Sequence, residues 1–286
     1  MSIVVTGATG RLGRLTVEAL LRRGTPAADI VATGRDITGI KDLADRGVTV
    51  RRADFADPDS LAEAFAGAYR LLLVSASVPV DGRVANHRRA IDAAAAAGVS
   101  LVAYTSTTHA DTAATVIGAT HGETEAYLRD HGIAHVLLRN GWYLENYTDQ
   151  LPHILAHGAV VGAASDGRIS AASRADYAEA AATVLTTEGH EGAVYELGGD
   201  ESFTLTELAA AISTATGEQI AYADLPVAEF AGALTAAGLP PELAEVLADA
   251  DLGMARGEMH TASGDLRRLI GRAPVTLAEA LAAAGR

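Results

Sequence analysis

The most constraining feature of the sequence is a glycine-rich turn near the start of the chain, between a short apolar run and an amphipathic segment. Ile3 to Val5 predicts a buried strand, and the turn reads Thr6-Gly7-Ala8-Thr9-Gly10-Arg11-Leu12-Gly13. Gly7 and Gly10 lack the Cβ atoms that would block a sharp turn and the approach of a pyrophosphate, and Gly13 lets the following helix pack closely. The helix start offers free N–H groups to an anion. We therefore predict a phosphate-binding turn; the alternative is a tight turn in another kind of α/β protein.

Composition narrows the classes of partner and chemistry. The 286-residue chain is 49% hydrophobic with a formal net charge of −14, so neither nucleic acid nor a membrane is an expected partner. It contains no Cys, and redox chemistry would therefore require a cofactor. His153 and His157 are spaced i, i+4 without a third ligand, so no metal is predicted. Without a targeting signal or an apolar run of membrane-spanning length, a cytoplasmic protein is expected.

Apolar runs alternate with helical patterns along the first half of the chain. This alternation predicts an α/β fold with a Rossmann-type doubly wound parallel sheet. We expect residues 1–150 to form a dinucleotide-binding domain, to which 160–200 return, and 201–286 to form a small C-terminal α/β lobe. The predicted strands of the sheet are 3–5, 29–34, 48–54, 71–75, 101–106 and 133–139.

The C-terminal lobe has its own helix signals. Thr204 with Glu207, and Thr276 with Glu279, have the spacing of a capping box ahead of an apolar stripe. Residues 230–254, broken by two prolines, predict two helices of a lid that selects substrate.

Arg35 follows the second predicted strand, at the position that selects the dinucleotide. An acidic residue there usually holds the ribose 2′-hydroxyl of NAD, whereas a guanidinium suits the 2′-phosphate of NADP. Arg35 thus favours NADPH. Asp36 beside it keeps NADH possible, and a solvated loop arginine is the alternative.

Polar or small residues end the next three strands, at the edge where open parallel sheets bind ligands. Asp54 either accepts from the adenine amino group or caps a local turn, with equal weight for the two. The small run Ser75-Ala76-Ser77 lets the backbone lie along the nicotinamide ribose. Thr105 and Ser106 are further candidates for cofactor contact.

The sequence lacks the Tyr-x-x-x-Lys pair that supplies the proton in most short-chain enzymes, so another residue is needed as a candidate proton donor. His121 and Glu125 stand i, i+4 on the helix predicted after the fifth strand. A His beside a Glu can hold a proton near neutral pH, which makes His121 a catalytic candidate. The alternative is an ordinary helical pair on a solvated face.

An aromatic loop follows the sixth predicted strand, from Asn140 to Tyr147. It holds the single Trp of a chain with only 5% aromatic residues. Aromatic faces with amides suit a flat ring with polar edges, such as nicotinamide or a quinone. We predict that Trp142, Tyr143 and Asn146 bind substrate; the alternative is a hydrophobic plug between the two lobes.

Motifs over nearly the whole chain carry a resemblance to a known family. They are Thr6–Gly13, Arg35, Ala103–Ser106, His109–Thr112, His121–Glu125, Leu138–Tyr143, Glu145–Tyr147, Ser173–Tyr177, Gly189–Gly192 and Val194–Leu197. The chain resembles the NAD(P)H:quinone oxidoreductase 2 family of NmrA-like, atypical short-chain dehydrogenases/reductases. The resemblance implies a Rossmann domain with a small lobe and NADPH-dependent two-electron reduction of quinones. That family also lacks the Tyr-x-x-x-Lys pair.

The resemblance also implies cofactor contacts. They are the glycine turn, Arg35, Ser75 to Ser77, Asn140, Gly141, Trp142 and Tyr143, with Arg174 bordering the cofactor. We expect hydride transfer to a quinone stacked by Trp142 and Tyr143, with Tyr143 and His121 as catalytic candidates and a homodimer as a possible assembly. The alternatives are an NmrA-like redox sensor that binds NADP without turnover, and a reductase of another flat carbonyl compound.

Overall fold

The computed structural model describes residues 2–76 and 82–285, so Ser77 lies outside the described residues. The chain divides into two compact units, each with its own hydrophobic core. The first unit comprises Met1–Ser106, Thr120–Arg139 and Arg174–Tyr195. The second comprises Thr107–Ala119, Asn140–Ser173 and Glu196–Arg286.

A seven-stranded sheet with the order β3-β2-β1-β4-β5-β6-β8 forms the centre of the first unit. The pairs β1/β2, β1/β4, β2/β3 and β4/β5 are parallel. The order reverses between β1 and β4, which defines the doubly wound fold and confirms the predicted class. The strands are β1 (Ser2–Val5), β2 (Ile30–Gly34), β3 (Thr49–Arg52), β4 (Ala68–Leu73), β5 (Leu101–Thr107), β6 (His135–Asn140) and β8 (Val194–Leu197).

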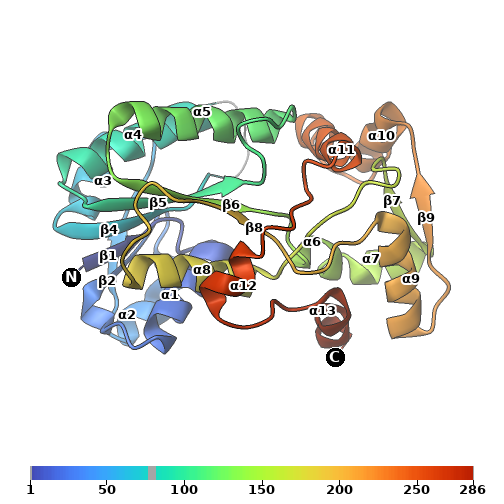
Figure 1. Ribbon diagram of the computed structural model, residues 1–286, viewed down its shortest axis with the longest axis horizontal. Helices are drawn as coiled ribbons and strands as arrows, with labels where there is room; N and C mark the ends of the chain where they lie inside the picture. The colour runs from blue at the N-terminus through green and yellow to red at the C-terminus, as the bar shows by residue number, and fades with distance from the viewer. Residues whose placement is uncertain (1, 77–81, 286) are drawn as a thin grey trace. The chain divides into compact units, whose positions relative to one another are not determined.

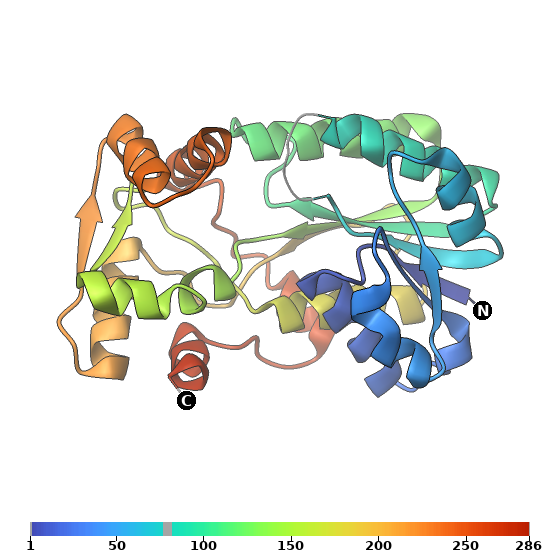
Figure 2. The same ribbon diagram turned by 180° about the vertical axis from the view of Figure 1, so that it is seen from behind.

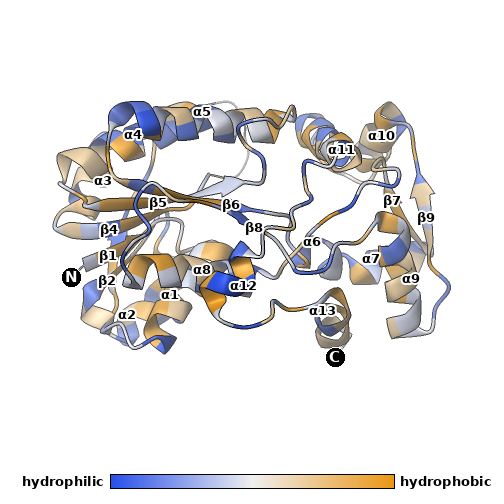
Figure 3. Ribbon diagram, viewed as in Figure 1, coloured by the Kyte–Doolittle hydropathy of each residue, from blue (hydrophilic) through white to orange (hydrophobic). Residues whose placement is uncertain are grey.

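Helices cover both faces of this sheet (Figures 1 and 2). One face carries α1 (Arg11–Arg22) packed against α8 (Arg174–Thr186), and the other carries α3 (Pro58–Phe65), α4 (Arg83–Ala96) and α5 (Val116–His131). The short α2 (Lys41–Asp45) precedes β3. The strands covered on both faces contain continuous apolar runs, Leu71–Leu73 in β4 and Leu101–Ala103 in β5, and Figure 3 shows the hydropathy of each residue along them.

The core of the first unit lies between the sheet and the α3, α4 and α5 layer. Leu71, Leu73 and Val102 of the strands are fully buried there with Phe65 and Ile91 of the helices. These runs explain why the sequence specifies the strands so well. A run that is apolar at every position has no face for solvent. Its backbone N–H and C=O groups can therefore be hydrogen-bonded only within a sheet that is covered on both faces.

The second unit contains a two-stranded parallel sheet and a set of helices around its own core. Both predicted capping boxes are present, at Thr204 with Glu207 and at Thr276 with Glu279. Its elements are α6 (Glu145–Thr148), α7 (Leu151–His157), β7 (Ala159–Gly162), α9 (Leu205–Thr216), β9 (Ala221–Asp224), α10 (Val227–Ala236), α11 (Pro241–Ala255), α12 (Asp265–Ile270) and α13 (Leu277–Ala284). Within the described ranges, no helix is long and apolar enough to cross a membrane.

The third glycine of the turn is required by packing, which gives a first prediction. A Cβ at Gly13 would lie 2.3 Å from the carbonyl oxygen of Gly7, and neither backbone can give way cheaply. We expect Gly13→Ala to lower the free energy of unfolding by about 3 kcal/mol, the upper part of the range for overpacking. Urea unfolding followed by circular dichroism measures this.

The matched control is Gly232→Ala in α10, where a Cβ meets nothing within 4 Å. An exposed helical site of this kind should gain about 0.5–1 kcal/mol from the same substitution. Equal stability of the two variants would contradict the packing role of Gly13.

Candidate nucleotide-binding and catalytic site

The glycine turn is held between two neighbouring strands. The N–H of Thr6 donates to Leu72 O at 3.0 Å, and the N–H of Ala8 donates to Thr33 O at 2.8 Å. Gly7 has a φ of +62°, a conformation that favours glycine. Helix α1 starts after Gly10 without a side-chain cap and without an acidic residue in its first turn. Its first N–H groups therefore offer an open anion site.

A hollow of about 550 Å³ lies beside this turn, lined by Thr9, Arg35, Asp36, Thr38 and Gly39. Asp36 accepts from the backbone N–H of Thr38 at 3.0 Å and from its hydroxyl at 2.7 Å, and these bonds lower the pKa of Asp36. The Asp36 carboxylate is thus hydrogen-bonded to a neighbour in its own loop. Arg35 is exposed, and no hydrogen bond or ion pair holds its guanidinium among residues 2–76 and 82–285.

Other arginines near the turn are occupied by acidic partners. Arg14 is paired with Asp42, and Arg46 donates to Glu18 at 2.7 Å. Arg11 is the first residue of α1 and is exposed. In this acidic chain, Arg35 therefore offers the hollow a cation that no carboxylate of residues 2–76 and 82–285 neutralises.

The contacts of Asp54 agree with the alternative in which this residue caps a local turn. Its carboxylate accepts from the N–H of Ala56 at 3.0 Å and lies 3.5 Å from an Arg52 nitrogen. Both contacts lie within two residues along the chain, as in a turn stabilised by its own aspartate.

The backbone after β4 is tied to the protein by side chains. The N–H of Ser75 donates to Thr105 Oγ1 at 2.9 Å, and the N–H of Ala76 donates to His87 Nε2 at 3.0 Å. Ser106 is buried and donates its hydroxyl to Glu125 at 2.6 Å. The hydroxyls of Thr105 and Ser106, predicted as cofactor contacts, are thus engaged with protein groups.

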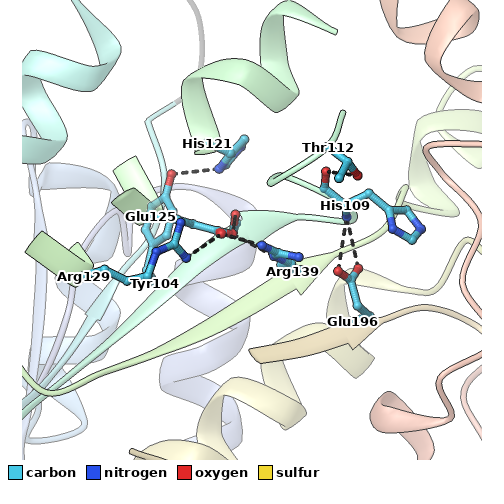
Figure 4. A network of polar contacts seen from close by, with 9 residues as sticks. Tyr104, His109, Thr112, His121, Glu125, Arg129, Arg139 and Glu196 are labelled. Atoms are coloured by element: carbon cyan, nitrogen blue, oxygen red, sulfur yellow. Dashed lines mark hydrogen bonds and ion pairs between the residues drawn. The ribbon is translucent and has the colours of Figure 1, made fainter. Parts of the chain in front are cut away.

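The expected pairing of His121 with Glu125 is wrong, and so is the alternative of a solvated helical pair. Both side chains are buried, and they have different partners (Figure 4). Glu125 binds Arg139 in a bidentate ion pair, with the Arg139 Nε at 2.9 Å and Nη2 at 2.6 Å. His121 instead contacts Arg83 and Tyr104. The strands packed against α5 supply partners that the helical spacing could not reveal.

The partners of His121 define its protonation. An Arg83 nitrogen lies 2.7 Å from His121 Nε2, and because a guanidinium only donates, Nε2 is the acceptor. The proton of the neutral ring is then on Nδ1, which donates to Tyr104 Oη at 2.8 Å. Burial, followed by the charge of Arg83, lowers the pKa of His121 well below its ordinary value. The histidine is neutral at pH 7, so it does not hold the extra proton that the sequence hypothesis required.

The aromatic loop belongs to the second unit. Trp142 and Tyr147 are half-buried and pack against the core of that unit, and Tyr143 forms a β-bridge with Ala172. Asn146 is half-buried in α6. The N–H of Gly141 donates to Leu197 O at 2.8 Å.

Asn140 carries an unusual buried group. Its carboxamide oxygen has no hydrogen-bond partner within the described part of the chain. A buried acceptor of this kind costs free energy unless a ligand or water satisfies it.

Of the remaining predicted contacts, Arg174 begins α8 and belongs to the first unit.

Sequence reasoning missed the buried polar residues around α4 and α5. His87, Tyr104 and Arg139 are all at most 5% exposed and all hydrogen-bonded within the first unit. His87 interrupts an alanine-rich helix and Arg139 ends an apolar strand. Polar residues at core positions are the signal that could have found them.

The first unit has a parallel doubly wound sheet, a glycine turn before a helix and, beside the turn, an arginine without a partner in the described part of the chain. These features define a nucleotide-binding protein of the α/β class. The NmrA-like family matches residues 1–260, and the chain belongs to that family. It is 48% identical over 279 residues to quinone oxidoreductase 2 of Escherichia coli, covering 98% of this chain and 97% of the relative.

Two solved structures show the same likeness in three dimensions. The NADPH complex of the NADPH-dependent quinone oxidoreductase QOR2 from Escherichia coli has a TM-score of 0.96 at 48% identity, over 99% of this chain and 100% of that one. The triphenylmethane reductase of Citrobacter sp. complexed with NADP(H) has a TM-score of 0.94 at 35% identity, over 99% and 100%.

The buried histidines predict a pH dependence of stability. Burial, followed by the charge of Arg83, lowers the pKa of His87 from 6.5 to about 3. Between these values the unfolded chain binds more protons than the folded one, so stability falls as the pH falls from 6.5 towards 3. We expect His87 to account for a loss of about 2 kcal/mol between pH 7 and pH 5.

Urea unfolding of wild type and His87→Gln at both pH values tests this. The variant, which has no titrating group at this position, should lose about 2 kcal/mol less than wild type over the interval. An identical loss in the two proteins would show that His87 is not the buried neutral group described above.

Proposed function

We propose that this chain is an NADPH-dependent oxidoreductase that transfers hydride to a quinone. The observation that carries the proposal is Arg35, which lines the hollow beside the glycine turn and has no ion-pair partner among the described residues. It is supported by likeness to quinone oxidoreductase 2 over 98% of the chain and by the NADPH named in the matching complex. These relatives favour an enzyme over the alternative of a redox sensor.

The residues of the first unit fit the adenosine and pyrophosphate parts of NADPH. The glycine turn and the open start of α1 suit the pyrophosphate. The turn and the helix pack so closely that a Cβ at Gly13 would meet the backbone of Gly7. Arg35 and the hydroxyl group of Thr9 suit a 2′-phosphate. Since Asp36 is bonded to Thr38, it is less available to a ribose hydroxyl, and NADPH is favoured over NADH.

When bound, NADPH supplies the hydride and its two electrons. We propose that Asn140, Gly141, Trp142 and Tyr143 contact its nicotinamide end, where the unsatisfied Asn140 oxygen would accept a hydrogen bond. Trp142, Tyr143 and Asn146 would orient the flat acceptor, and this orientation would supply most of the rate. The two-electron product would take its proton from water or from the Tyr143 hydroxyl, because His121 is neutral and bonded at both ring nitrogens.

Further parts of the proposal concern the whole protein. We infer a cytoplasmic enzyme with a small-molecule substrate, working as a homodimer. Residues 1–150 with 160–200 would bind the cofactor, and 201–286 would select the substrate. A flat acceptor other than a quinone is the second candidate, and the Citrobacter relative named for triphenylmethane reduction supports it.

The function is tested by steady-state oxidation of NADPH at 340 nm. We expect turnover with benzoquinones and naphthoquinones well above the uncatalysed rate, and weaker turnover with a triphenylmethane dye. NADPH binding without turnover of any quinone would favour the sensor, and turnover of the dye alone would favour the second candidate.

The role of Arg35 gives a separate prediction. A hydrogen bond to a charged group contributes about 1.5–3 kcal/mol, so Arg35→Ala should raise KM for NADPH roughly 10- to 150-fold. KM for NADH should change less than about twofold, since NADH has no 2′-phosphate. Kinetics with both cofactors measure the change.

Arg46→Ala is the control, because Arg46 is also exposed but is paired with Glu18 and does not line the hollow. It should leave both KM values unchanged. A parallel rise of KM for NADPH and NADH in Arg35→Ala would contradict 2′-phosphate recognition.

A further inference from the structure

Three consecutive backbone N–H groups after β4 are each held by a buried side chain from a different element. The N–H of Val74 donates to Thr6 Oγ1 at 2.9 Å. The next two donate to Thr105 Oγ1 at 2.9 Å and to His87 Nε2 at 3.0 Å. The three acceptors are at most 3% exposed. Acceptors from the end of β1, from β5 and from α4 therefore fix the course of the chain from Val74 to Ala76.

His87 is held in one orientation and one tautomer by its other contacts. Because Nε2 accepts from Ala76, the proton of the neutral ring is on Nδ1, which lies 3.0 Å from Thr124 Oγ1. The Thr124 hydroxyl in turn donates to Thr120 O at 2.9 Å. The bonds run in one direction, from the Ala76 amide through the imidazole to the α5 backbone.

The surroundings keep this imidazole neutral. Arg83 of α4 is the charged group that acts on His87. Tyr104 Oη of β5 lies 3.4 Å from Nδ1, and the Phe55 ring meets the imidazole edge-on with centroids 6.3 Å apart. A cation and apolar surfaces both oppose protonation, so Nε2 remains an acceptor over the whole physiological pH range.

We infer that His87 is a positioning residue for the cofactor: its Nε2 holds the Ala76 amide, and so shapes the turn after β4 before NADPH binds. The inference rests on the proposed function and on the sequence-based prediction that the nicotinamide ribose lies along Ser75 and Ala76. A turn already fixed in the free protein loses little conformational freedom on binding. Without the acceptor, the Ala76 amide would turn towards water and the peptide planes beside it would shift.

The experiment compares His87→Leu, which removes the acceptor, with His87→Gln, whose side-chain oxygen can replace Nε2. We expect the Leu variant to raise Kd for NADPH, measured by its fluorescence, about tenfold, or about 1.4 kcal/mol. The Gln variant should stay within about threefold of wild type. KM for NADPH should follow Kd, while KM for the quinone should change little.

Hydrogen exchange supplies a readout that needs no cofactor. In the free protein, the Ala76 amide should exchange slowly in wild type and in His87→Gln, and at least about tenfold faster in His87→Leu. His131→Leu is the matched control, because this histidine is on α5 and is paired with Asp92 rather than with the turn. It should change neither Kd nor the exchange of Ala76.

Thr105→Val is the second variant, which keeps the test sharp if His87→Leu does not fold. It removes the acceptor of Ser75 with little change in shape and should also raise Kd for NADPH. If His87→Leu folds and its Kd for NADPH is unchanged, the inference is overturned. If His87→Leu does not fold, an unchanged Kd in Thr105→Val overturns it. Either result leaves quinone reduction by wild type intact. Wild type that binds NADPH without reducing a quinone would instead contradict the proposed function alone, because Kd and exchange still report on His87.

Discussion

The buried ion pair between Glu125 and Arg139 is the interaction on which the carboxyl-terminal edge of the sheet in the first unit depends. The Glu125 side chain is fully buried, and its oxygens accept from two Arg139 nitrogens and from the Ser106 hydroxyl. Two buried charges are tolerated only when they are paired and hydrogen-bonded. The cluster therefore fixes α5 to the ends of β5 and β6. Ser106 and Arg139 are also the residues at which these strands pass from the first unit into the second.

The distribution of charge explains how an acidic chain can provide a site for an anionic dinucleotide. Most arginines along the β1, β2 and β3 edge are neutralised by acids, as Arg14 is by Asp42 and Arg52 by Asp57. Surface pairs of this kind contribute little stability, but each removes a cation that would otherwise attract anions. Arg35 lacks such a pair within the described chain and lines the hollow. The pairing of the other arginines therefore leaves Arg35 as the cation for the proposed contact with a 2′-phosphate.

The fold and the geometry of the glycine turn could be predicted because their signals are local. Val4 and Leu71 belong to runs whose apolar character alone specifies covered strands, and the spacing of Gly7, Gly10 and Gly13 specifies the turn. The partners of His121 could not be predicted in this way. The spacing of His121 and Glu125 places them on one helix face, but whether they meet depends on Tyr104, Arg139 and Arg83, which are distant in sequence. That choice is made by sheet order and packing, and a single sequence does not show it.

The two buried histidines do not replace the missing Tyr-x-x-x-Lys pair as proton donors. An imidazole that shuttles protons needs a pKa near the working pH and a nitrogen open to the substrate. His87 and His121 have neither: both have depressed pKa values, and each ring nitrogen is already bonded. A quinone accepts hydride readily and its product can take a proton from water, so a precisely tuned acid is dispensable for this acceptor. What hydride transfer cannot do without is a fixed distance and angle between donor and acceptor. The buried hydrogen bonds of His87 and His121 hold the edge of the sheet rigidly, and rigidity of that kind is what the proposed hydride transfer requires.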